Sequence, residues 1–221
     1  MNKKFSVIIN KKIKKFNKTI KIPGDKSCSI RAILFASQCI GISNIKNLLK
    51  SDDVMMCVSA LRALQVKIAQ IKDIYKVYGN GLGSLRANKK IKIFVGNSGT
   101  TARLLTGLLA THPGKFYLYG DKSMNQRDMS RVFDPLEKIG AFFHPKGKKT
   151  LPITIEGTTM PLAQTHIENL GSAQVKSCLL AAFLNTPGRS TIKEEKISRN
   201  HSEILLKKIS ADIKVKKLKK G

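Results

Sequence analysis

The chain has 221 residues, with 42% hydrophobic and 25% charged positions, a balance that supports a buried core and argues against intrinsic disorder. It has no run of the roughly 20 apolar residues that a membrane span needs. Residues 1–15 also lack the apolar stretch of a signal peptide, so we expect a cytoplasmic protein with no membrane partner.

The formal net charge of +27 favours anionic ligands, but the positive charge is spread along the chain. Lysine outnumbers arginine 33 to 8, and the lysines are scattered rather than gathered in one arm. Biased, A-rich coding gives the same excess, so no specific nucleic-acid partner is predicted. A basic nucleic-acid-binding module stays open as an alternative, and it predicts RNA binding with a steep salt dependence.

The cysteines and histidines predict neither a disulfide framework nor a metal site, and we expect no cofactor. The cysteines are widely spaced and form no Cys-x-x-Cys pair, and most lie in apolar helical contexts where a free thiol packs as a small hydrophobe. The histidines show neither ligand spacing nor cysteine neighbours. The residues are Cys28, Cys39, Cys57 and Cys178, and His112, His144, His166 and His201.

A first predicted unit covers about residues 21–90 and opens on the turn Gly24-Asp25-Lys26-Ser27. Ser51 is a start signal for its second helix. Two helices and two β-type runs are predicted after the turn, at residues 30–38, 52–64, 66–71 and 75–78.

A second unit, about residues 91–165, repeats this order after the turn Gly96-Asn97-Ser98-Gly99. Its helices are predicted at 101–110 and 128–139, and its closing β-type runs at 141–144 and 152–155. The Gly-rich turns of successive units start about 72 to 75 residues apart, which indicates an internal repeat. Each unit is predicted as strand, helix, strand, helix, strand, strand.

A third unit, about residues 166–221, opens on Gly171-Ser172 and has predicted helices at 174–184 and 201–209. A strand is predicted at 211–215, after which only the lysine-rich residues 216–221 follow. We therefore expect the third unit to be incomplete, through truncation or because a second half is separately encoded. A native short form is the open alternative.

The turns resemble anion sites, because a helix N-terminus presents unpaired N–H groups and about half a positive charge. Lys26 and Ser27 stand at the first helix start, with Arg31 one turn later on the same face. Asn97 and Gly99 offer a bare backbone in the second unit, and Arg127 follows it. Taken singly, such a lysine or arginine is usually a solvated surface group, so the hypothesis depends on the set.

Four ordered motifs closely resemble the 3-phosphoshikimate 1-carboxyvinyltransferase (EPSP synthase) family over about residues 21–215. They are Pro23-Gly24-Asp25-Lys26-Ser27-x-Ser29-x-Arg31, Gly96-Asn97-Ser98-Gly99-Thr100-Thr101-x-Arg103, Ser172-Ala173-Gln174-Val175-Lys176-Ser177 and Ser198-Arg199-x-His201. The resemblance covers about the first half of a family member. It implies an α/β (α+β) fold, an inside-out α/β barrel lobe of three βαβαββ repeats, with residues 1–20 forming a strand segment that pairs with the second lobe.

The resemblance also implies a function, namely enolpyruvyl transfer from phosphoenolpyruvate to the 5-hydroxyl of shikimate 3-phosphate in chorismate and aromatic amino acid synthesis. No metal or organic cofactor takes part. The implied shikimate 3-phosphate ligands are Lys26, Ser27, Arg31, Ser172, Ala173, Gln174, Ser198 and Arg199, and the implied phosphoenolpyruvate ligands are Lys26, Asn97, Gly99, Arg127 and Gln174. The catalytic proton-transfer residues are expected in the second lobe, and this half alone is expected to be inactive.

Departures from the family pattern qualify this interpretation. Ile30 stands where a histidine is usual, Asp128 where a proline is usual, and Asn200 where an aspartate is usual. The carboxylate of Asp128, placed beside Arg127, is expected to weaken anion binding. A UDP-N-acetylglucosamine enolpyruvyl transferase relative is a further alternative, disfavoured because Lys26-Ser27 stands where that branch has Lys-Asn.

Overall fold

The computed structural model describes residues 6–12, 15, 17–85, 87 and 90–216 as a mixed α/β protein. Within this part of the chain the helices are α1 (Lys26–Ala36), α2 (Asp52–Ala63), α3 (Gly99–Leu109), α4 (Ser130–Ile139), α5 (Ala173–Phe183) and α6 (His201–Lys208), with a short 3-10 helix at Met124–Gln126. The strands are β1 (Ile40–Lys46), β2 (Lys67–Ile71), β3 (Ile74–Asn80), β4 (Ile91–Phe94), β5 (Gly114–Tyr119), β6 (Phe142–His144), β7 (Ile153–Gly157), β8 (Thr165–Glu168) and β9 (Thr191–Glu194).

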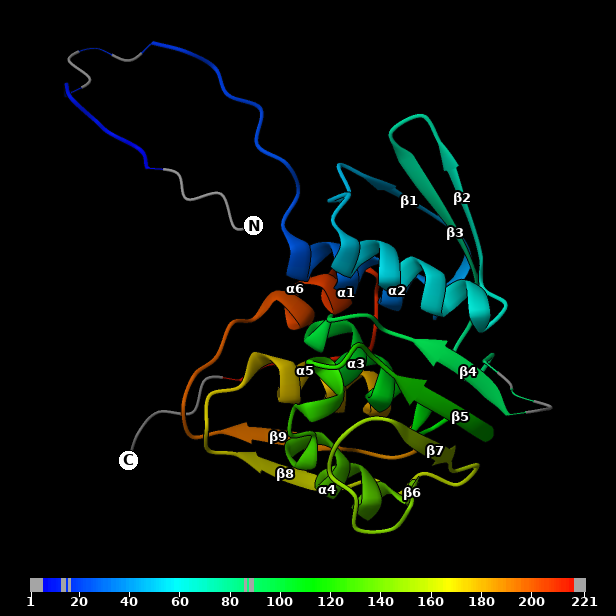
Figure 1. Cartoon of the computed structure of the whole chain (residues 1–221). Helices are drawn as coiled ribbons and strands as arrows, with labels where there is room; N and C mark the ends of the chain where they lie inside the picture. Colours follow the sequence, from blue (N-terminus) through cyan, green and yellow to red (C-terminus); the bar gives the residue numbers. More distant parts are fainter. Residues whose placement is uncertain (1–5, 13–14, 16, 86, 88–89, 217–221) are drawn as a thin grey trace.

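The nine strands of the described residues form three separate sheets, which lie outside a central group of helices (Figure 1). The first sheet has the order β1-β3-β2 and is antiparallel throughout. The second has the order β4-β5-β7-β6, in which only β4 and β5 are parallel. The third pairs β8 with β9 in parallel. In strand order and direction, the first sheet therefore corresponds to strands β5, β7 and β6 of the second sheet. The third sheet corresponds in the same way to the parallel pair β4 and β5.

A pair of glycines marks the same place in the first two sheets. Gly41 pairs with Gly79 across β1 and β3, and Gly114 pairs with Gly157 across β5 and β7. A Cβ on Gly79 would lie 2.2 Å from the carbonyl oxygen of Cys39, and one on Gly157 would lie 1.9 Å from that of His112. Only glycine lets these strands approach the backbone that follows the first helix of the unit so closely.

The core lies between α3, α5 and the sheets. Every residue of α3 except Arg103 is buried, as expected of a helix that is surrounded by protein. Its neighbour α5 packs directly against it, and a Cβ on Gly107 of α3 would lie 2.0 Å from the carbonyl oxygen of Cys178. The two helix axes therefore cross closely at Gly107.

The first helix of each unit begins with the capping residue that its turn supplies. Asp25 accepts a hydrogen bond from the backbone N–H of Cys28, Ser98 from that of Thr101, and Ser172 from that of Val175. These caps explain why α1 begins at residue 26, rather than at residue 30 as the apolar pattern predicts. The other predicted helices are confirmed to within two residues at each end.

Two predictions about strands are wrong for the described residues. Residues 211–215 form no strand, and no strand opens the first unit, because neither segment has a hydrogen-bonded neighbour and a strand exists only through its pairing. Residues 6–12, 15 and 17–20 likewise have no regular structure and extend away from the helices (Figure 1). Their pairing with a second lobe stays a prediction. Among the described residues, the helices are all too short or too polar to cross a membrane.

Candidate anion-binding site

An open hollow of about 560 Å³ lies where α1, α2, α3 and α5 begin. All five residues predicted for phosphoenolpyruvate line it, together with six others. The lining residues are Lys26, Ser51, Asp52, Asp53, Asn97, Ser98, Gly99, Thr100, Arg103, Arg127 and Gln174. Residues from all three predicted units therefore meet at one hollow.

Lys26 lies at the first position of α1 and is half-exposed. Its Nζ lies 2.7 Å from Oδ2 of Asp53, which belongs to the first turn of α2. An exposed ion pair of this kind contributes little to stability, about 0–1 kcal/mol. Its effect is to hold the ammonium group at the edge of the hollow beside the start of α2.

Two guanidinium groups approach the start of α3 from the opposite side. Arg127 donates a hydrogen bond to Oδ1 of Asn97, and Arg103 donates to Oε1 of Gln174 at 2.8 Å. Gln174 in turn donates to the hydroxyl of Thr100 at 3.0 Å. These contacts connect the turn before α3 with Arg127, connect α3 itself with the first turn of α5, and fix the side-chain amide of Gln174.

Gly99 makes the approach of the two arginines possible. A Cβ at this position would lie 3.0 Å from one guanidinium nitrogen of Arg103 and 3.0 Å from one of Arg127. The bare backbone leaves the N-terminus of α3 facing the two guanidinium groups, so helix dipole and side-chain cations act at one place. This arrangement favours a small anion such as a phosphate or carboxylate.

The electrostatics of Arg103 agree with this interpretation. Burial lowers the pKa of its guanidinium, and the neighbouring positive charges of Arg127 and Arg131 lower it further, with only Asp128 and Cys178 acting in the opposite direction. Several cations are held close together with little acidic compensation on that side of the hollow. An anionic ligand would relieve this repulsion.

Asp128, expected to weaken anion binding beside Arg127, makes its own contacts at the start of α4, and its effect on binding stays a prediction. Its carboxylate accepts hydrogen bonds from the backbone N–H of Ser130 at 3.0 Å and from the Ser130 hydroxyl at 2.7 Å. These bonds lower the pKa of Asp128 and hold the carboxylate at the start of α4. The Asp128 side chain is therefore bound to Ser130 just before α4, while Arg127 pairs with Asn97.

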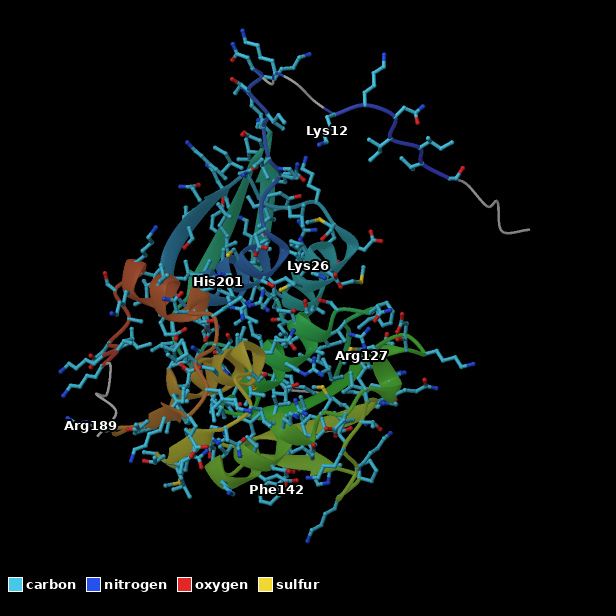
Figure 2. All side chains as sticks on the ribbon, turned by 90° about the vertical axis from the view of Figure 1, so that its left-hand side faces the viewer. Lys12, Lys26, Arg127, Phe142, Arg189 and His201 are labelled. Carbon is cyan, nitrogen blue, oxygen red and sulfur yellow. The ribbon has the colours of Figure 1, made fainter. Side chains whose placement is uncertain are left out.

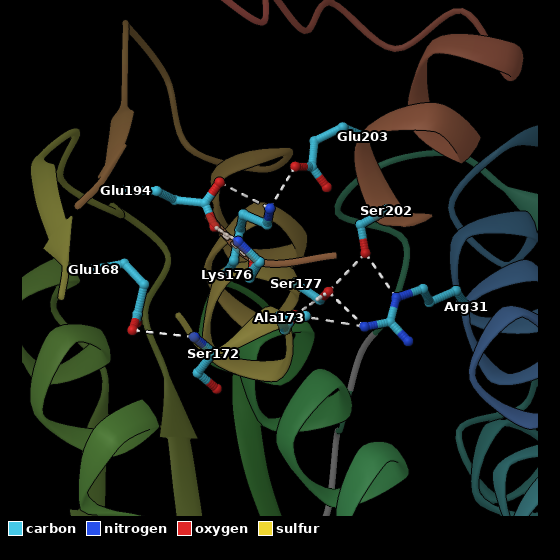
Figure 3. Close-up of polar contacts among 10 residues, drawn as sticks. Arg31, Glu168, Ser172, Ala173, Lys176, Ser177, Glu194, Ser202 and Glu203 are labelled. Atoms are coloured by element: carbon cyan, nitrogen blue, oxygen red, sulfur yellow. Dashed lines mark hydrogen bonds and ion pairs between the residues drawn. The ribbon is translucent and has the colours of Figure 1, made fainter. Parts of the chain in front are cut away.

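Arg31, predicted to bind phosphate, is 3% exposed and joins three helices (Figure 3). Its guanidinium donates to the hydroxyl of Ser202 at 2.8 Å and to that of Ser177 at 2.8 Å, and also to the backbone carbonyls of Ser27 and Ala173. Burial lowers its pKa. Arg31 thus links α1 to α5 and α6 in this structure, and its contact with a ligand stays a prediction.

The remaining residues predicted for shikimate 3-phosphate lie at or just before the starts of α1, α5 and α6 rather than in the lining of the hollow. Ser172 caps α5, and Ala173 is its first residue. Ser198 binds one oxygen of Glu194 through its N–H and its hydroxyl, at 3.2 and 2.6 Å. Arg199 is exposed just before α6, and Ser27 lies in the first turn of α1.

Lys176 does not line the hollow; it is buried and takes part in an ion cluster with two carboxylates (Figure 3). Its Nζ lies 3.0 Å from Glu194 and 2.6 Å from Glu203, and its side chain is 4% exposed. The cluster holds α5, the end of β9 and α6 together. Lys176 is therefore already neutralised by protein carboxylates.

Arg103 and Asp53 belong to the site without having been assigned a role from the sequence. Arg103 follows Gly99 by four residues, the spacing that places two helical positions on one face, so its position in the second motif carried a usable signal. Asp53 carried no comparable signal, because its contact with Lys26 joins residues 27 positions apart.

No cysteine is close to a histidine in the sequence, but the fold brings one such pair together. Nδ1 of His201 lies 3.7 Å from Sγ of Cys28, although 173 positions separate them. Asp25 completes a cluster of three potential ligand side chains.

Comparisons with known proteins point to one family. The family model for EPSP synthase (3-phosphoshikimate 1-carboxyvinyltransferase) matches residues 10–220. The 3-phosphoshikimate 1-carboxyvinyltransferase of Paramagnetospirillum magneticum is 38% identical over 201 residues, which are 90% of this chain and 45% of that protein. The one from Streptococcus uberis is 40% identical over 195 residues, covering 88% and 45% respectively.

A solved structure, EPSP synthase from Acinetobacter baumannii, has a TM-score of 0.83 at 32% sequence identity, covering 89% of this chain and 45% of that chain. The chain thus spans about half the length of the curated relatives it matches.

Proposed function

This chain belongs to the EPSP synthase (3-phosphoshikimate 1-carboxyvinyltransferase) family, and on that premise we propose that it forms an anion-binding lobe for enolpyruvyl transfer. The enolpyruvyl group passes from phosphoenolpyruvate to the 5-hydroxyl of shikimate 3-phosphate, and phosphate is released. The product serves chorismate and aromatic amino acid synthesis. The proposal rests on one observation above all: three helix starts and the cations Lys26, Arg103 and Arg127 surround a common hollow.

We assign phosphoenolpyruvate to the α3 side of this hollow. Its phosphate and carboxylate groups match the two guanidinium groups, because planar guanidinium donors bind such oxygens in pairs. Asn97 positions Arg127, Gly99 leaves room for the anion, and Gln174 is held by Arg103 and Thr100. Lys26 contributes its ammonium group from the opposite side.

We assign shikimate 3-phosphate to the neighbouring starts of α1, α5 and α6. Lys26 and Gln174 are shared between the two ligands, and Ser27, Ser172, Ala173, Ser198 and Arg199 supply hydroxyl, backbone and guanidinium donors. Arg31 stabilises this proposed subsite, because its hydrogen bonds fix the relative positions of α1, α5 and α6. This role makes Arg31 a positioning residue as well as a candidate ligand.

The proposal includes an architecture and a partner. The three units are taken as βαβαββ repeats of an inside-out lobe at about residues 21–90, 91–165 and 166–221, and residues 1–20 are taken to pair with a second lobe. That lobe, on the same or a separate polypeptide, would supply the proton-transfer groups. The family resemblance supports these assignments, and also a cytoplasmic location and a reaction without cofactors.

Titration calorimetry with phosphoenolpyruvate and with shikimate 3-phosphate tests the proposal. We expect weak binding by this chain, and a loss of phosphoenolpyruvate affinity of about 10-fold or more for Arg127→Ala, since a hydrogen bond to a charged group contributes about 1.5–3 kcal/mol. Lys26→Ala should weaken both ligands. Arg189→Ala is the matched control, because Arg189 is exposed and lies well apart from Arg127 (Figure 2).

The competing outcome is equally clear. If neither ligand binds, even after the second lobe of a relative is added, the site assignment is wrong. RNA binding at physiological salt that Lys26→Ala leaves unchanged would instead favour a nucleic-acid-binding module.

A further inference from the structure

Three side chains that carry metal-binding donor atoms meet where α1 and α6 begin. Asp25 is the N-cap of α1, Cys28 lies in the first turn of that helix, and His201 is the first residue of α6. Sγ of Cys28 lies 3.7 Å from Nδ1 of His201. One ligand atom from each of the three residues lies within 4.8 Å of the other two.

The separations fit a tetrahedral metal ion. Zn²⁺ binds cysteine sulfur at about 2.3 Å and histidine nitrogen at about 2.0–2.1 Å, so two such ligands at the tetrahedral angle lie roughly 3.6 Å apart. The distance of 3.7 Å between Cys28 and His201 is close to this value. Asp25 and Cys28 are exposed and His201 is partly exposed, so small side-chain rotations can bring the carboxylate into place.

Local contacts hold the carboxylate beside the thiol. Oδ1 of Asp25 accepts a hydrogen bond of 2.7 Å from the backbone N–H of Cys28, and this bond also caps α1. Because this bond fixes the orientation of the carboxylate, it also fixes the position of Oδ2 of Asp25. Hydrogen bonds of this kind orient metal ligands and increase affinity.

The charges around the cluster allow a divalent cation. A thiolate and a carboxylate together carry two negative charges, which balance Zn²⁺. Burial and Asp25 raise the pKa of Cys28, while the facing cations Arg31 and Arg199 lower it. Because a bound metal displaces the thiol proton, affinity should increase with pH. The guanidinium of Arg31 is already bound to Ser177, Ser202 and two backbone carbonyls.

We propose that Asp25, Cys28 and His201 form a Zn²⁺ site that joins the start of α1 to the start of α6. Three protein ligands leave a fourth position open for water or an anionic oxygen. The side chain of Asn200 makes no capping bond to α6, a helix of eight residues, so a metal ion at its first residue would anchor a weakly fixed helix. The site adjoins the position assigned to shikimate 3-phosphate at the starts of α1 and α6, but it supplies no group to the proposed transfer reaction.

Titration of the whole chain with Co²⁺, followed by displacement with Zn²⁺, tests the site. We expect one Co²⁺ per chain, with the visible absorption of a tetrahedral ion and the near-ultraviolet charge-transfer band of a thiolate ligand. Zn²⁺ should remove both bands and raise the unfolding temperature, because it binds the native state.

Two ligand variants and one control make the result specific. Cys28→Ser should abolish the charge-transfer band and weaken Zn²⁺ binding by about 10-fold or more, and His201→Asn should weaken binding but keep the band. Cys39→Ser, which removes a partly buried thiol outside the cluster, should change neither. Circular dichroism confirms that each variant is folded.

A wild-type chain that binds Co²⁺ without a thiolate band, or fails to bind it, overturns the proposal. So does a band that persists in Cys28→Ser or disappears in Cys39→Ser. Calorimetric titration with phosphoenolpyruvate, run on the same variants, keeps this result separate from the anion-site assignment.

Discussion

The hollow and the polar interior between α5 and α6 use the same kinds of cation in opposite ways. In the hollow, Lys26 and Arg127 pair with Asp53 and Asn97 and remain partly exposed. In the interior, Arg31 and Lys176 are 3% exposed and are surrounded by protein acceptors. A partly exposed cation is therefore able to bind a ligand. A buried cation whose donors are already bonded to protein acceptors holds helices together instead.

The largest expected effect is the loss of the buried cation Lys176. Lys176→Met should lower the free energy of unfolding by about 3–5 kcal/mol, because it removes a buried cation and leaves the partly buried Glu194 and Glu203 without their counter-charge. Lys149→Met is the matched control, since Lys149 also bridges two carboxylates but is more exposed, and about 1 kcal/mol or less is expected. Urea unfolding measures both. Equal losses would contradict the distinction.

A smaller effect on stability is expected for Arg31. Arg31→Met should cost about 2–3 kcal/mol, because its charged hydrogen bonds are lost while Ser177 and Ser202 can still bond to each other at 2.7 Å. Arg103→Met should change stability by less than about 1 kcal/mol but weaken phosphoenolpyruvate binding. Unfolding and calorimetric titration of both variants test this crossed pattern. If both variants lost stability and phosphoenolpyruvate affinity in the same proportion, the proposed difference between the two arginines would be refuted.

The interior should also respond to acid. Burial opposes ionisation of Glu194, but hydrogen bonds from Ser198 and Lys176, together with the charge of Lys176, lower its pKa below the ordinary value of 4.5. A lowered pKa in the folded state contributes stability above pH 4.5 that is lost as the pH falls through the folded pKa. In Glu194→Gln, unfolding measured across this range should depend less on pH. If the pH dependence of unfolding were the same in Glu194→Gln and the wild type, Glu194 would not contribute to the acid sensitivity of the fold.

The smallest change in stability is expected in the hollow itself. Gly99→Ala places a Cβ 3.0 Å from two guanidinium groups, which must then move by a few tenths of an ångström. Phosphoenolpyruvate affinity should decrease about 3- to 10-fold, while the unfolding free energy changes by less than about 1 kcal/mol, since alanine is a better helix former than glycine. Calorimetry and urea unfolding on the same samples check both values. A large loss of stability would mean that the glycine serves packing instead.

The sequence by itself determined the features that depend on neighbouring residues. The glycine-containing turns that contain Asp25, Ser98 and Ser172 were recognisable as leading into helices, because turn residues and the helix that follows them are neighbours in the sequence. The helices and the order of the elements followed from apolar spacing for the same reason. The five residues predicted for phosphoenolpyruvate do line one hollow, which their attachment to such turns made foreseeable.

Only the tertiary structure decided what depends on distant partners. Residues 211–215 have the composition of a strand but no neighbour to pair with. The side chain of Arg31 is enclosed by Ser177 and Ser202, about 150 to 170 positions away in the sequence, and Cys28 meets His201 across a similar separation. Local propensity carries no information about such contacts, because they form only when whole helices pack together.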